Sequence, residues 1–130
     1  MASNFKPISI VSLDVGRTEQ SKTASGLRLM HLKLSQSPSN EWEILFNNQR
    51  QFPRHSMWRG ASISGNFIVV DCVPEEIERL LGDLKEDVSV VNGKYQEYLA
   101  KKAAEEQRIA AEQQAEKLRL DQINARLKFD

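Results

Sequence analysis

Segment 49–59 contains the residue types best suited to binding chemistry in this chain. It carries three arginines, one histidine and two aromatic residues, and it has no acidic residue. Guanidinium groups bind phosphate and aromatic rings stack on bases, so this combination is typical of surfaces that bind single-stranded nucleic acid. Arginine and tryptophan are also common at the energetic centres of protein interfaces. The predicted partner-binding residues are Arg50, Phe52, Arg54, His55, Trp58 and Arg59.

Two considerations limit this interpretation. The chain has 18 basic and 18 acidic residues, whereas a dedicated binder of polyanions usually carries a basic excess. The apolar residues Phe52, Met57 and Trp58 could instead hold the loop against the core, with the arginines left in solvent. We therefore keep two hypotheses for the segment: a surface for a macromolecular partner, and a single-stranded nucleic-acid-binding module.

No motif in the chain predicts catalysis or a phosphate-binding loop. Gly60 and Gly65 have the spacing of the two glycines in such a loop, but the Lys-Ser/Thr pair that completes the motif is missing. Asp14 and Asp71 could form a pair of carboxylates, but acids near strand ends more often bond to turns or face water. We expect a non-enzymatic protein without a cofactor.

The histidines and the cysteine do not predict a metal site. His31 and His55 have no cysteine or acidic cluster at ligand spacing. The single cysteine, Cys72, lies in an apolar run and is interpreted as a small buried hydrophobic residue. The first residues lack the apolar core of a secretory signal, and no stretch approaches the ~18–20 apolar residues of a membrane span. We expect a soluble cytoplasmic protein that does not enter a membrane.

Alternating apolar and polar residues predict a sheet in the first half of the chain. The expected strands are 8–15, 27–34 and 41–46, followed by a hairpin of 59–64 and 67–72 around Gly65-Asn66. Segment 47–59 is expected to be a loop. Short connections favour an antiparallel meander of four or five strands in an α+β fold, with a small open β-barrel as the alternative.

Helical patterns begin at Pro74. A short helix over 74–81 is expected to end at Gly82, and a second is expected to begin at Asp83. Segment 88–98 has apolar residues at helical spacing, but its Asn92-Gly93 pair is also a strong hairpin signal. We favour the helix, because the same spacing continues into the residues that follow.

The last third of the chain predicts one long helix from about 94 to 127, without glycine or proline and rich in strong helix formers. We expect a compact domain over 1–92 and a projecting helix over 93–130. The helix is apolar at its base and tip and polar in its middle, so it falls short of a continuous coiled coil. Three hypotheses stay open: an exposed single helix, self-association with a dimer favoured, and docking to a different protein. The predicted oligomerisation residues are Ile109, Leu118, Leu120, Ile123, Leu127 and Phe129.

Overall fold

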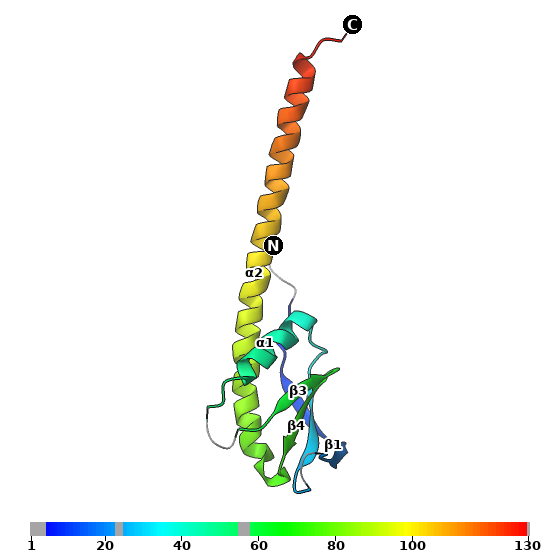
Figure 1. The fold of residues 1–130 in the computed structure, drawn as a ribbon, viewed down its shortest axis with the longest axis vertical. Helices are drawn as coiled ribbons and strands as arrows, with labels where there is room; N and C mark the ends of the chain where they lie inside the picture. Colours follow the sequence, from blue (N-terminus) through cyan, green and yellow to red (C-terminus); the bar gives the residue numbers. More distant parts are fainter. Residues whose placement is uncertain (1–4, 23–24, 55–57, 130) are drawn as a thin grey trace. The chain divides into compact units, whose positions relative to one another are not determined.

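A computed structural model describes residues 5–22, 25–54 and 58–129. It contains strands β1 (Ile10–Gln20), β2 (Arg28–Leu34), β3 (Ala61–Ser64) and β4 (Phe67–Cys72) in one sheet of order β1-β2-β4-β3 (Figure 1). All neighbouring strands are antiparallel. The sheet is open, so the predicted α+β fold is confirmed and the barrel alternative is wrong. The strand order departs from a simple meander at one point, since β4 lies beside β2.

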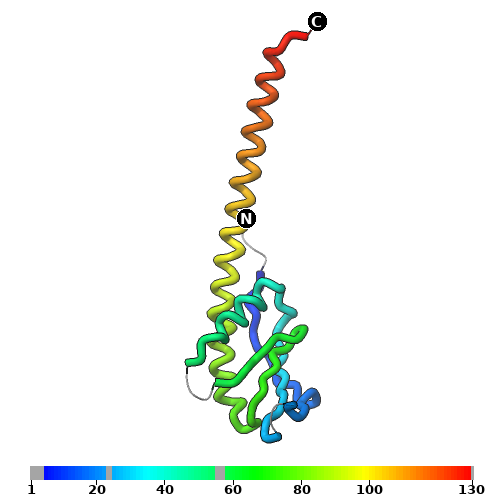
Figure 2. The backbone as a smooth tube through the Cα atoms, in the orientation of Figure 1, coloured from blue at the N-terminus to red at the C-terminus, as the bar shows by residue number. Residues whose placement is uncertain are grey.

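The apolar face of the sheet follows from strict alternation along β2 and β4. Met30 pairs with Val70 and Leu32 pairs with Ile68, and all four side chains are buried. Successive side chains in a strand point to opposite faces, so these pairs form one continuous apolar surface. The β3–β4 hairpin is confirmed, and its turn uses Gly65 at a φ of 59°, which favours glycine. Figure 2 shows this hairpin in green beside the cyan β2.

The predicted strand 41–46 is wrong, because these residues lie in helix α1 (Asn40–Arg50). The Ser39 side chain accepts a hydrogen bond from the Trp42 backbone N–H and caps the helix. Trp42 and Phe46 are fully buried and stacked, one helical turn apart, whereas Ile44 is 50% exposed. A strand and a helix both place Trp42 and Phe46 on one side. A strand would also place Ile44 there, whereas a helix turns Ile44 away, so only Ile44 distinguishes the two. Residues 47–50, the first part of the predicted loop 47–59, also belong to this helix, so the loop prediction is wrong for them.

A 3₁₀ turn, η1 (Pro74–Glu76), leads into helix α2 (Ile77–Arg126), a single helix of 50 residues. The predicted break between Gly82 and Asp83 is therefore wrong. The prediction of a helix over 88–98 is confirmed, and the hairpin alternative is wrong. Buried side chains occur on both sides of Gly82, namely Leu80 and Leu84, so their burial outweighs the ~1 kcal/mol cost of a helical glycine.

Both helices contribute to one core on the apolar face of the sheet. Trp42 and Phe46 of α1 and four apolar α2 residues are buried with the strand residues. Asn92 joins three segments, because its Oδ1 accepts hydrogen bonds from the Ile8 N–H (3.1 Å) and from Trp42 Nε1 (3.0 Å), and its Nδ2 donates to the Ile8 carbonyl (2.8 Å). This explains why an asparagine occupies a helical position beside the core.

The chain divides into two compact units, and each is considered separately. The first unit is Phe5–Tyr95, and the second unit contains 96–129 of the described residues. The boundary predicted between 92 and 93 stays a prediction. Among the described helices, none combines the length and the apolar character needed to cross a membrane.

We expect alanine at Gly82 or Gly93 to raise the free energy of unfolding by ~0.5–1 kcal/mol each, because both lie inside α2 and an added Cβ meets no atom within 4 Å. Urea unfolding of each variant measures the change. Gly65→Ala is the matched control, and its positive φ predicts a loss of about 1 kcal/mol. A destabilised Gly82→Ala would mean that α2 is interrupted there.

Candidate functional site

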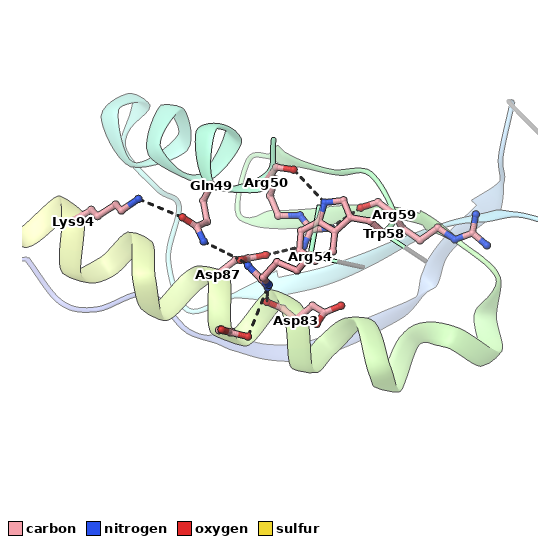
Figure 3. Close-up of polar contacts among 9 residues, drawn as sticks. Gln49, Arg50, Arg54, Trp58, Arg59, Asp83, Asp87 and Lys94 are labelled. Atoms are coloured by element: carbon pink, nitrogen blue, oxygen red, sulfur yellow. Dashed lines mark hydrogen bonds and ion pairs between the residues drawn. The ribbon is translucent and has the colours of Figure 1, made fainter. Parts of the chain in front are cut away.

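The centre of the candidate site is Asp87, an acid on the buried face of α2. Its side chain has no exposed surface. One carboxylate oxygen accepts from Arg50 Nη1 at 2.7 Å, and the other accepts from Arg54 Nη1 at 2.6 Å (Figure 3). Arg50 comes from the end of α1, and its side chain is only 5% exposed. A buried charge is tolerated only when it is paired, so these contacts fix the end of α1 against α2.

Trp58 completes this arginine cluster, which we define as Arg50, Arg54, Trp58 and Asp87. The guanidinium carbons of Arg50 and Arg54 lie 3.8 Å and 4.7 Å from the centre of the Trp58 ring. The Trp58 Nε1 donates to the Arg50 carbonyl at 3.1 Å. Cation–π contact of this kind is strongest with tryptophan and gains from partial burial. The tryptophan therefore covers the buried ion pair from the side of the loop.

Arg59 connects the cluster to the start of the long helix. Its backbone carbonyl accepts from Arg50 Nη2 at 2.5 Å, and its side chain donates to Glu76 at 2.9 Å. Glu76 also accepts from the Val73 N–H and from Arg79. Desolvation alone would raise the pKa of Glu76, but these hydrogen bonds and the charges of Arg59 and Arg79 together lower it.

Arg54 is the cluster member with the most solvent contact. Its side chain is 33% exposed, and it also lies 3.7 Å from Glu86. The hydrogen bond to Asp87 is the main cause that raises the pKa of Arg54, against partial desolvation. The outer edge of the site continues through Gln49, which donates to Asp87 at 3.4 Å and accepts from Lys94 at 3.3 Å.

The structure thus brings four of the predicted partner-binding residues together, and it leaves Phe52 outside this group. Arg50, Arg54, Trp58 and Arg59 bind residues of their own chain, and Phe52 is 73% exposed rather than packed in the core. His55 and Met57 lie outside the described residues. The residue that sequence reasoning missed is Asp87. Its signal was an acid at the spacing of the apolar positions Leu80, Leu84 and Val91, which requires a buried cation nearby.

The other titratable residues singled out in the sequence lie on strands of the sheet, and Asp14 pairs with His31 across β1 and β2. His31 lies half-buried with its ring edge-on to Phe67, Asp14 pairs with Arg17, and Asp71 accepts from Ser21. Within the described ranges, no group of three or more His, Cys, Asp or Glu residues could hold a metal ion. Cys72 is buried as expected, and burial raises the pKa of its thiol.

A second candidate surface lies on α2 in the second unit. The large apolar side chains there are exposed to different degrees: Ile109 is 42% exposed, Leu120 52% and Leu127 53%. Phe129, beyond the helix end, is 80% exposed, and Ile123 is half-buried. Arg108 pairs with Glu105 and Glu112, and Arg119 pairs with Glu116 at 2.7 Å, so charged residues also support the helix.

No protein-family model, curated protein or solved structure matches this chain.

We expect Asp87→Asn to lower the free energy of unfolding by ~3–5 kcal/mol, because it leaves the buried Arg50 charge without its carboxylate. Chemical denaturation measures the loss. Phe52→Ser, at an exposed position, is the control and should change stability by less than ~0.5 kcal/mol. If Asp87→Asn does not fold, the double variant Arg50→Met/Asp87→Leu should restore folding, since it removes both charges. Failure of the double variant together with a stable Asp87→Asn would contradict the ion pair.

The lowered pKa of Glu76 predicts a pH-dependent contribution to stability. A carboxyl whose pKa is lower in the folded state stabilises the fold above its unfolded pKa, near 4.5, and this contribution disappears as the pH falls through the folded value. The stability difference between the wild-type protein and Glu76→Gln should therefore shrink from pH 7 towards pH 3. A difference that is constant across this range would show that the carboxylate charge contributes nothing.

Proposed function

We propose that this chain is a non-enzymatic interaction protein that self-associates through α2 in its second unit and binds a macromolecular partner near segment 49–59. The observation that carries the proposal is the row of exposed apolar side chains on α2. Each Å² of apolar surface that stays in water costs roughly 25 cal/mol of free energy relative to its burial. Association with other copies of the chain removes this surface from water.

The helical period determines which of the predicted residues share a face. At 3.6 residues per turn, Ile109, Leu120, Ile123 and Leu127 fall within one narrow row. Leu118 falls on the opposite side of the helix. Leu127 and Phe129 lie past its last residue, Arg126, but the Leu127 N–H donates to the Asn124 carbonyl at 3.2 Å, so Leu127 continues the last turn. The proposed association surface is therefore the row of four, and Leu118 provides an internal control.

The partner surface rests on the exposed edge of the arginine cluster. Phe52 presents a large apolar ring to solvent, and Arg54 presents part of a guanidinium group beside it in the chain. Aromatic and arginine side chains are frequent at the centres of protein interfaces. The nucleic-acid alternative has less support, because Arg50, Arg54 and Arg59 each already bind an acidic side chain of this chain. A cytoplasmic location remains part of the proposal.

We expect the full chain to sediment as an oligomer at micromolar concentration. The triple variant Leu120→Gln/Ile123→Gln/Leu127→Gln should sediment as a monomer, because it places polar groups on the association row. Leu118→Gln, on the opposite side, should leave the oligomer unchanged. A wild-type monomer, or equal disruption by Leu118→Gln, would contradict self-association through this row.

A further inference from the structure

The association row, which consists of Ile109, Leu120, Ile123 and Leu127, has the spacing of a heptad repeat. The order of leucine and isoleucine in such a repeat influences how many helices associate. We infer that it joins three or four copies of this chain as parallel helices rather than two. The inference rests on the proposed self-association and names its partner, which is a set of identical helices running in one direction. It follows from the order of leucine and isoleucine along the row, and from the charges beside it.

The heptad positions follow from the spacing. The row and the polar residues between its members are separated by alternating steps of four and three: Ile109, Gln113, Glu116, Leu120, Ile123 and Leu127. We call these six residues the seam. A step of three leads from position a to position d, so Leu120 and Leu127 occupy a, and Ile109 and Ile123 occupy d.

Leucine at a with isoleucine at d is the arrangement that disfavours a parallel pair. In a two-stranded parallel coil the side chain at d points directly at the neighbouring helix, and a branch at Cβ forces it out of its preferred rotamer. In bundles of three or four helices, the spaces between side chains of the neighbouring helix are wider, so an isoleucine at d fits in its preferred rotamer. The seam contains isoleucine at both of its apolar d positions, Ile109 and Ile123.

The relative direction of the helices follows from which side chains would meet in a parallel and in an antiparallel arrangement. In a parallel bundle the layers of Leu120, Ile123 and Leu127 stay wholly apolar, and the Gln113 amides lie level, where each can donate to and accept from another. In an antiparallel pair with full overlap, Gln113 faces Ile123, so the Gln113 amide lies against an apolar side chain without a partner. Burial of unpaired polar groups disfavours the antiparallel pair.

The charges beside the seam favour the same direction. Glu112 comes just before an a position, and Lys117 comes just after a d position. In a parallel bundle Glu112 therefore lies beside Lys117 of the adjacent copy. The antiparallel pair instead places Lys117 against Lys117 at its centre. The parallel bundle has one unfavourable layer, Glu116, and each Glu116 is already bound to Arg119 of its own chain at 2.7 Å.

Sedimentation equilibrium of the full chain tests the copy number. The wild-type protein should have three or four times the mass of one chain. The matched variant Ile109→Leu/Leu120→Ile/Ile123→Leu/Leu127→Ile keeps the amino-acid composition and only exchanges the two positions, so it should form a dimer. A wild-type dimer, or equal masses for the two proteins, overturns the inference. A wild-type monomer overturns the proposed self-association itself.

Equilibrium disulfide formation tests the direction, and the buried Cys72 leaves the introduced thiol as the reactive one. In a glutathione buffer, Gln113→Cys should form a disulfide with another copy of the same variant, because position 113 lies level with itself in a parallel bundle. An equimolar mixture of Gln113→Cys and Ile123→Cys is the comparison. Preferential formation of the mixed disulfide would show an antiparallel pair and overturn the inference.

Discussion

The buried carboxylate of Asp87 is the constraint on which the first unit depends. It lies on the apolar face of α2 among leucine and valine side chains, and it has no contact with solvent. A lone charge in that position would be strongly unfavourable, so α1 and the segment after it must bring Arg50 and Arg54 to it. This requirement positions the end of α1 and places Trp58 over the guanidinium groups. The arginines that suggested nucleic-acid binding are therefore explained first as partners of buried and half-buried acids.

Polar residues at other buried positions have the same role of joining distant segments. Asn92 holds the backbone of Ile8 and the indole of Trp42, so the start of the chain, α1 and α2 meet at one side chain. Glu76 joins Arg59, Arg79 and the backbone of Val73 at the beginning of the helical region. Each of these residues satisfies several donors, which specifies geometry more strongly than apolar packing does.

The two units of the chain differ in what stabilises them. The first unit has a continuous apolar core, and buried polar side chains such as Asp87 and Asn92 bond to other residues of the same unit. The second unit is a helix whose side chains are mostly exposed, with local ion pairs such as Arg119–Glu116 and an unpaired apolar row. A helix of this kind gains little from its own residues, since each local pair contributes only ~0.2–0.5 kcal/mol. Burial of its apolar row against another helix would add stability that these local pairs do not supply.

The sequence by itself determined the features that depend on neighbouring residues. Alternation in β2 and β4, the Gly65-Asn66 turn and the helical spacing over 88–98 are local patterns, and they predicted the corresponding elements. Only the tertiary structure decided the features that depend on contacts with residues distant in the sequence. Residues 40–50 became a helix, α2 passed through Gly82, and β4 rather than β3 joined β2. Asp87 acquired its role in the same way, because its two arginines lie 37 and 33 residues earlier, beyond any local pattern.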